Sequence, residues 1–433
     1  MRLTALKISA AILLLPLALR AQVRAVPPTI HPEIGDSFSK GGISITLIAK
    51  KQYYDRYDTL TADTSVRSPK SVNVTPDGTK FYVNCLEGGN TVVFETSSLR
   101  KMSVVSHKIT PEKDSLWTKA DGLFSFHRKR KDPDTFTGKP VEGTFSHGGK
   151  YFWVPYYRRN YDNNAVEPSA VAVINTLTDK IVRIFETGPL PKMVATSPDS
   201  KIIAVTHWGD NTVGLIDIAS WDPSEWRYSD LITVEQKLAL NFAPGATIDR
   251  DVNSGYCLRG TVFTPDGRYL LVGCMGGSGG IAVIDLASRT YLGRIFGMRS
   301  NLRHLVLRDG WLYMSINNAG YIQKVPLQTV LDAIPNIKNR MVRISGITEC
   351  KVPAGARTIA LSPDGRYIFA ACNFSSRLAV VDAEKMVKIG EMPVDSYPVG
   401  LDLSKDGSLI FVTSQARMGY GGNCVGIYSL KYE

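Results

Sequence analysis

A Pro-Asp-Gly turn between two apolar strands recurs along this chain, and its repetition constrains the fold more than any other feature. The clearest copy is Pro363-Asp364-Gly365, within the stretch from Arg357 to Asp382. Pro363 presets φ at the first corner, Asp364 can bond its own backbone, and Gly365 accepts the left-handed conformation that closes a hairpin. The turn therefore predicts two antiparallel strands, followed by a polar loop and a third strand.

Seven stretches carry this turn or a degenerate form of it, at intervals of roughly forty to seventy residues. In chain order they are 68–78, 142–154, 191–200, 259–267, 303–310, 357–382 and 398–407. All-β repeats of this length are typical of propeller blades, in which four-stranded sheets surround a channel. We therefore expect an all-β protein, a seven-bladed β-propeller.

The two ends of the array predict how the ring closes. The seventh repeat has room for only three strands before Glu433, whereas an isolated apolar strand runs from Ile43 to Ala49. This N-terminal strand can join the last blade as its fourth strand and remove an open edge. We expect a leader segment at residues 22–42 and the propeller at 43–433. Two smaller β domains, the alternative, would leave the isolated strand unexplained.

The hairpins of the form Ser-Pro-Asp-Gly-x-x-aromatic, followed by Val-x-Val-Ile-Asp strands, resemble the YVTN-type repeats of surface-layer and YncE-like bacterial propellers. The resemblance covers nearly the whole chain from Ile43 onward. It implies a secreted propeller related in architecture to lactonase-like propellers, amine dehydrogenase heavy chains and the haem domain of nitrite reductases. Because those relatives carry different chemistries on one scaffold, the resemblance implies a fold and not an activity.

The N-terminus predicts export. Arg2 and Lys7 precede an apolar run at residues 8–19, and Ala21 stands before Gln22 as a cleavage point. Since the run is too short to span a bilayer comfortably, we expect a signal peptide at residues 1–21. The mature protein would be secreted, periplasmic or on the cell surface, without a membrane span. An uncleaved membrane anchor is the alternative.

The charge balance favours anionic partners to a small degree. The chain has 51 basic and 40 acidic residues, a formal charge of +11, and loss of Arg2, Lys7 and Arg20 with the leader leaves 48 against 40, or +8. Without a concentrated basic helix or an RNA-binding motif, nucleic acid is not an expected partner. We expect an anionic small molecule or polysaccharide, or a protein partner, and a monomeric state.

Neither cysteines nor acidic clusters predict a cofactor. Six cysteines in a chain of this length are not the disulfide framework of a small secreted domain, although Cys257 and Cys274 bracket one hairpin and could pair. No Cys-x-x-Cys motif is present, so covalent haem is not indicated. An oxygen-rich loop lacks EF-hand spacing, which leaves Ca²⁺ a weak alternative to no metal. Its residues are Asp162, Asn163, Asn164 and Glu167.

Cations recur at one position of the repeat. Lys70, Lys192, Arg259 and Arg357 each stand seven residues before the Asp of the turn, and Arg303 takes the same place in a shorter turn. Because the first strand of each blade lines the channel, we expect these five cations to converge at the channel mouth and attract an anion. The alternative is that they cap strand ends or pair with neighbouring acids. Glu142 lies one residue past this position in the second repeat, and Val399 fills it in the seventh.

Long insertions lie near the first four repeats, at residues 110–140, 155–169 and 241–258. Long loops in compact folds are often functional, and we expect all three to emerge on the face that carries the cations. One contains Tyr156, Tyr157 and Arg158, which suit a sugar ring or an anionic polymer. Another contains the basic tract 127–131, for which a solvated surface is the main alternative.

Three residues are candidates for acid–base chemistry at this face, namely Glu142, His207 and His304. A histidine near a strand end can act as a general base if its pKa is close to the working pH, but it is more often a hydrogen-bonded structural residue. Trp208 ends the second strand of the third repeat together with His207, and Trp208 and Asn373 are further candidates for ligand contact. The leading hypothesis is a ligand-binding or partner-binding propeller without catalysis. A lactonase-like hydrolase of a small carboxylate or sugar lactone is the second, and a cofactor-bearing oxidoreductase the third.

Overall fold

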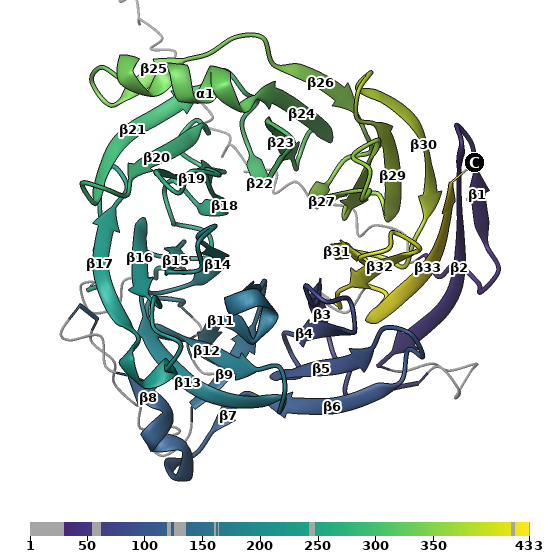
Figure 1. Ribbon diagram of the computed structural model, residues 1–433, viewed down its shortest axis with the longest axis horizontal. Coiled ribbons are helices and arrows are strands. Elements are labelled where there is room, and N and C mark those ends of the chain that lie inside the picture. Colours follow the sequence, from purple (N-terminus) through teal and green to yellow (C-terminus); the bar gives the residue numbers. More distant parts are fainter. Residues whose placement is uncertain are drawn as a thin grey trace, which may run out of the picture.

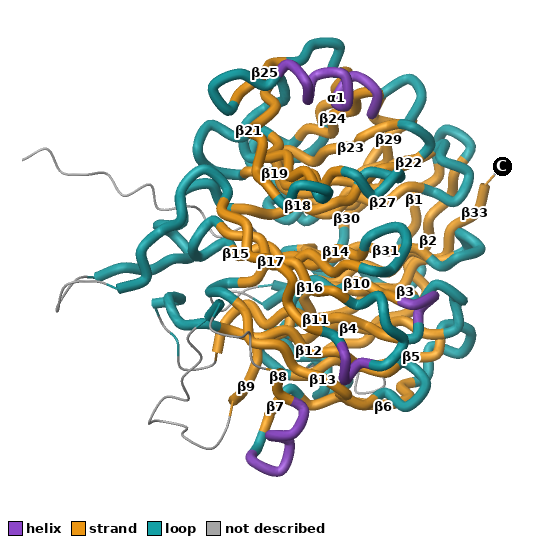
Figure 2. The backbone as a smooth tube through the Cα atoms, turned by 60° about the vertical axis from the view of Figure 1, so that its left-hand side comes forward, coloured by secondary structure: helices purple, strands orange, loops and turns teal. Residues whose placement is uncertain are grey.

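The computed structural model describes residues 30–53, 62–118, 123–124, 136–159, 162, 164–241, 247–416 and 421–432. The expected signal peptide, the basic tract at 127–131 and Asn163 lie outside the described residues. Within them the chain is all-β, and its sheets stand radially around a central opening (Figure 1). A view turned by 60° shows that the strands run between two faces on which the loops gather (Figure 2). In the described part, no helix is both long and apolar enough to cross a membrane.

Four sheets are four-stranded, and the chain crosses each of them in order from the centre outward. Their strands are β3 (Pro69–Val74), β4 (Lys80–Cys85), β5 (Asn90–Glu95) and β6 (Lys101–Ser106); β14 (Pro191–Thr196), β15 (Ile202–His207), β16 (Thr212–Asp217) and β17 (Arg227–Thr233); β22 (Leu302–Arg308), β23 (Trp311–Ile316), β24 (Tyr321–Pro326) and β26 (Thr348–Lys351); and β27 (Ala356–Leu361), β28 (Tyr367–Cys372), β29 (Arg377–Asp382) and β30 (Val387–Pro393). A short 3-10 helix, η3 (Pro223–Glu225), precedes β17. The hairpins between the first and second strands of these sheets form at the predicted turns.

Two further sheets have five strands in a linear order. One contains β18 (Leu258–Phe263), β19 (Tyr269–Cys274), β20 (Ile281–Asp285), β21 (Thr290–Phe296) and β25 (Met341–Arg343). The other contains β31 (Pro398–Leu403), β32 (Leu409–Ser414), β33 (Cys424–Tyr432), β2 (Ile43–Gln52) and β1 (Ser37–Ser39). N-terminal β2 therefore pairs antiparallel with C-terminal β33. The expected leader is partly structured, because β1 forms a hairpin with β2.

The remaining sheet is irregular. Its strands are β7 (Lys108–Ile109), β8 (Trp117–Thr118), β9 (Phe136–Pro140), β10 (Thr144–Ser146), β11 (Tyr151–Arg159), β12 (Ser169–Asn175) and β13 (Lys180–Thr187). β9 and β10 both pair with β11, so the sheet branches. The 3-10 helices η1 (Pro111–Leu116) and η2 (His147–Gly149) lie beside it in sequence. The described part of insertion 110–140 thus adds strands to this sheet and is not only loop.

A crossover between two sheets was not predicted. After β24 the chain forms helix α1 (Leu327–Ala333) and the 3-10 helix η4 (Ile334–Asn336), and then adds β25 in parallel to β21 of the preceding sheet. Leu327 and Val330 of α1 are buried in the apolar cluster between these two sheets. The segment therefore ties neighbouring sheets together at their outer edge.

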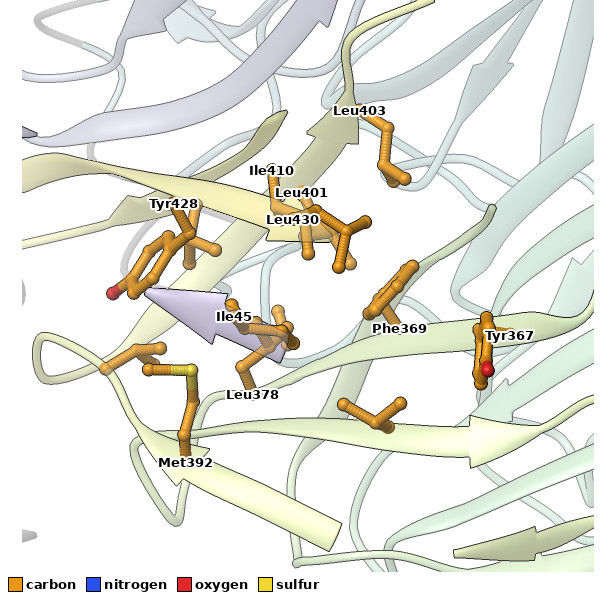
Figure 3. Close-up of a cluster of buried hydrophobic side chains, with 14 of the residues drawn as sticks. Ile45, Tyr367, Phe369, Leu378, Met392, Leu401, Leu403, Ile410, Tyr428 and Leu430 are labelled. Carbon is orange, nitrogen blue, oxygen red and sulfur yellow. The ribbon is translucent and has the colours of Figure 1, made fainter. Parts of the chain in front are cut away.

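Apolar side chains fill the space between adjacent sheets. In one such cluster, Phe369 and Leu378 of the β27–β30 sheet meet Ile45 of β2 and Tyr428 of β33 (Figure 3). Burial of large apolar side chains stabilises by about 1.5–3 kcal/mol each. Since the radial sheets touch through these clusters, the packing fixes where the innermost strands lie.

Substitution of Gly365 tests the assignment of the turn that defines the repeat. Its φ is +72°, in the left-handed region, where a β-branched side chain is strained. Gly365→Val should lower the free energy of unfolding by about 1–3 kcal/mol in a urea titration. Gly365→Asn is the matched control, because Asn tolerates this region, and it should stay within about 1 kcal/mol of the parent. Equal stability of the Val variant and the parent would contradict the turn assignment.

Candidate functional site

In six sheets, the residue just before the innermost strand has an unusual backbone conformation. The second residue before the repeated cation position has a positive φ in each case. These residues are Ser68, Leu190, Cys257, Asn301, Gly355 and Tyr397. Five of the six are not glycine, and a left-handed conformation costs such residues on the order of 1–3 kcal/mol. Because this left-handed conformation recurs at the same position in six sheets, it is a regular feature of the repeat.

A β-bulge directly follows this left-handed residue and sets the direction of the cationic side chain. In β3, Pro69 pairs with Cys85 and Ser71 with Asn84, so that Lys70 between them has no partner across the ladder. The same shift in register occurs at the start of β14, β18, β22, β27 and β31. A bulge redirects the side chain of the extra residue. The repeated cation is therefore the second residue of its strand and stands at the bulge.

Arg259 and Arg357 meet one carboxylate, that of Glu142. Arg259 Nη2 donates to Glu142 Oε1, and Arg357 Nη2 lies 3.9 Å from the same oxygen. The two arginines are only 3% and 4% exposed. Burial alone would raise the pKa of Glu142, but Arg259, Lys70, Arg357 and Arg303 together lower it to about 2. Glu142 is therefore a permanent carboxylate at neutral pH, and it partly neutralises the cations.

Lys70 and Arg303 complete this group, which we call the cation cluster: Lys70, Arg259, Arg303 and Arg357. Burial lowers the pKa of Lys70 well below its ordinary value, and the nearby charges of Arg357, Arg259 and Arg303 lower it further, against the effect of Glu142. Lys70 Nζ donates to Gln415 Oε1 at 3.4 Å. Burial and the charges of Arg357 and Arg259 also lower the pKa of Arg303. Four basic groups thus act on the charge of one carboxylate, and the three guanidinium groups alone outnumber it.

Lys192, the fifth predicted cation, interacts with residues outside the cation cluster. Its Nζ donates to Asp251 Oδ1 at 2.7 Å, and it lies 4.0 Å from the ring centre of Tyr157 and 4.6 Å from that of Trp208. Burial lowers the pKa of Lys192 to about 8, although Asp251 opposes the shift. Arg158 in turn lies over the ring of Tyr157 at 4.8 Å. For Lys192, the alternative of pairing with a neighbouring acid is therefore what the structure shows.

The three arginines of the cation cluster border a cavity of 520 Å³ along the axis of the molecule. Glu142, Arg259, Arg303 and Arg357 line it, as does His304. Its wall continues along the innermost strands β3, β22, β27 and β31 to Arg308 and Lys405. Such a volume is in the range of pockets for small organic ligands.

His304 is a neutral hydrogen-bond donor in this wall. The backbone N–H of Ile359 donates to His304 Nδ1 at 3.3 Å, so the ring proton must be on Nε2. Burial lowers the pKa of His304 to about 4, and Arg259 and Arg303 contribute, although the charge of Glu142 opposes the shift. In this state the imidazole can donate from Nε2 but cannot accept a proton there.

Several predicted site residues lie away from the cavity. His207 is fully buried, with Nε2 at 2.5 Å from Thr187 Oγ1 and Nδ1 at 2.7 Å from Thr212 Oγ1, so it is structural. Tyr156 belongs to strand β11 and not to a loop, and its hydroxyl lies 2.9 Å from Nδ1 of buried His107. Asn373 is buried and accepts from the Nδ2 group of Asn317 at 3.1 Å. None of the three lines the cavity.

Neither a metal centre nor a disulfide is formed by the described residues. They contain no group of three His, Cys, Asp or Glu side chains arranged to hold a metal ion. Asp162, part of the predicted oxygen-rich loop, instead accepts from the backbone N–H groups of Val166 and Glu167. All six cysteines are free thiols, and Cys257 and Cys274 do not pair.

Comparison with solved structures shows the fold. Hydrazine synthase from Kuenenia stuttgartiensis is similar, with a TM-score of 0.57, 13% identity, and coverage of 83% of this chain and 95% of that chain. The Cps50 (Swd1) β-propeller domain of Myceliophteria thermophila is similar with a TM-score of 0.57, 12% identity, and coverage of 84% and 96%. The chain is thus a β-propeller protein. Comparison with protein-family models and with curated proteins gives no match.

The ion pairs of Glu142 make stability depend on pH. Because the pKa of Glu142 in the folded state is about 2, below its ordinary 4.5, its contribution is complete above pH 4.5 and is lost as the pH falls toward 2. Glu142→Gln should cost about 3–5 kcal/mol at pH 7 and flatten this part of the profile in urea titrations. The exposed Glu225→Gln should leave the profile as it is. Parallel profiles for Glu142→Gln and the parent would contradict the ion pairs.

Proposed function

We propose that the protein binds a small organic anion at the cation cluster, as a binding propeller without chemistry of its own. The observation that supports this proposal is that Arg259, Arg303 and Arg357 line one cavity together with Glu142, whose carboxylate accepts from Arg259 and lies 3.9 Å from Arg357. An excess of buried positive charge is costly. Lysine can release its proton in response, but the guanidinium groups remain charged. A bound anion would offset this excess beside Arg303, whose Nε has no hydrogen-bond partner among the described residues.

A lactonase-like hydrolase is the second candidate, because Glu142 and His304 line the same cavity. Their chemistry favours binding over hydrolysis. Glu142 is held as a carboxylate by its arginine partners, and His304 Nδ1 accepts from the backbone of Ile359. A general base needs a free lone pair within reach of the proton that it removes. Turnover of sugar lactones by the purified protein would favour the hydrolase.

We also propose that the seven sheets are seven blades and that β2 closes the ring through its pairing with β33. Six sheets are linear and the seventh is branched, but the strand β10 of the branched sheet packs on β14 of the next. On its other side, Ser71 Oγ and Asn73 Nδ2 of β3 donate to the carbonyl oxygens of Val141 and Gly143, just before β10. These contacts support a position for the branched sheet between two regular blades.

We propose in addition that the protein is related to YVTN-type propellers and that it is exported. The Pro-Asp-Gly hairpins support the first, and the basic, apolar and small residues at 1–21 support the second. An exported anion-binding propeller would meet acidic sugars, phosphates or carboxylates outside the cytoplasm.

Arg303 offers the sharpest test of anion binding, because its Nε has no hydrogen-bond partner among the described residues. Arg303→Gln should remove like-charge repulsion, so the free protein should melt at the same temperature as the parent or higher. The rise in melting temperature with added phosphate or acidic sugars should be lost. Both effects are measured in one thermal-shift series.

Arg308→Gln is the control, since Arg308 lines the far end of the same cavity and donates to the carbonyl of Pro363 outside the cluster. This variant should keep the anion-dependent rise. A rise that persists undiminished in Arg303→Gln would overturn the assignment of the anion to the cation cluster.

A further inference from the structure

We infer that the anion enters the axial cavity from the face that carries the Pro-Asp-Gly turns and meets a closed end at the cation cluster. The site would then take a small molecule or the acidic end of a longer one, and not an internal segment of a polymer. This inference rests on the proposed function and narrows the class of its ligand. From the sequence we expected the ligand at the opposite face, which carries the insertions.

Side chains from three sheets that are not neighbours meet on the axis. Glu142 precedes β10 of the irregular sheet, Arg259 belongs to β18 and Arg357 to β27. The sheet of β14 stands between the first two, and the sheet of β22 stands between the last two (Figure 1). Because Arg259 donates to Glu142 Oε1 and Arg357 Nη2 lies 3.9 Å from the same oxygen, these side chains reach across the centre of the ring. We call the three the axial plug, since they fill the axis at this level.

The cavity lies on the turn side of the axial plug. Its wall follows β22, β27 and β31 to Arg308, Pro363 and Lys405, where these strands end and their turns begin. Pro363 and Lys405 are exposed, so the cavity is open to solvent at the turns. Asp251 and Gln415, which bond Lys192 and Lys70 toward the insertion face, are not part of the lining. A cavity closed at one end admits a small molecule or a chain end, but no polymer can pass through it.

The open end of the cavity is also positively charged. Its lining contains five basic side chains against two carboxylates, and a confined excess of one charge attracts ligands of the other. The basic residues are Arg259, Arg303, Arg308, Arg357 and Lys405, and the acidic ones are Glu142 and Asp402. Arg303 and His304 are both partly exposed, and His304 carries its ring proton on Nε2. An anion that enters past Arg308 and Lys405 therefore meets Arg303 and His304 as its donors.

Modification by phenylglyoxal tests this route, because this uncharged reagent condenses with guanidinium groups and must enter the cavity to reach Arg303. The rate at Arg303 is followed in the purified protein by peptide mass spectrometry. In Lys405→Cys, a pyrene maleimide on the new thiol obstructs the turn face. Asn318→Cys with the same cap is the matched control, because Asn318 is exposed on the opposite face, where its backbone N–H donates to Asn301 just before β22. The parent treated with the maleimide controls for the native thiols.

The cap on Lys405→Cys should slow the modification of Arg303 at least about fivefold, and the cap on Asn318→Cys should leave the rate as in the parent. An unchanged rate under the first cap would overturn entry from the turn face, as would a parent in which Arg303 is not modified at all. Neither result would decide whether an anion binds, so the proposed function is tested separately with phosphate.

Inorganic phosphate should protect Arg303 of the parent from phenylglyoxal. Long-chain polyphosphate at the same concentration of phosphoryl groups should protect at most about a tenth as well, because its internal groups cannot reach the closed end. Equal protection by the two would overturn the restriction to small molecules and chain ends and leave anion binding intact. Modification of Arg303 at an undiminished rate in phosphate would overturn the proposed function itself.

Discussion

Repulsion between cations that the repeat brings together is the constraint on which this site depends. In six of the seven sheets the innermost strand begins with the same left-handed residue and the same bulge, so equivalent residues of successive sheets are placed at the same level around the axis. In four of these strands the residue is a member of the cation cluster. Glu142, between β9 and β10 and one residue past the equivalent position, supplies one negative charge beside these cations. The proposed anion site follows from this imbalance.

The scaffold can hold this imbalance because its stability comes from elsewhere. Apolar clusters fill the spaces between adjacent sheets, and the outer β2–β33 pairing and the β25 crossover add contacts far from the axis (Figures 1 and 3). Replacement of a cation at the centre therefore changes electrostatics more than packing. Functional sites are commonly strained in this way, with the cost offset by the rest of the fold.

The sequence predicted the propeller and all four residues of the cation cluster because both follow from repetition. Aligned turns place Lys70, Arg259, Arg303 and Arg357 in register, and their common position suffices to bring them together. It could not predict the bulge, since the residues in left-handed conformation before it share no side-chain type. Nor could it predict that β11 extends through Tyr156 or that His207 lies between two threonines, because both depend on contacts between distant strands. The separate pairing of Lys192 with Asp251 depends on an insertion in the same way.

A crystal structure of the protein soaked in selenate tests the central claim most directly, because selenium scatters anomalously and reports the position of the anion without assumption. The account predicts an anomalous peak in the axial cavity, within hydrogen-bond distance of Arg303 and close to Arg357 and Lys70. Selenate bound only at surface lysines and arginines, with the cavity beside Glu142 occupied by water alone, would contradict it.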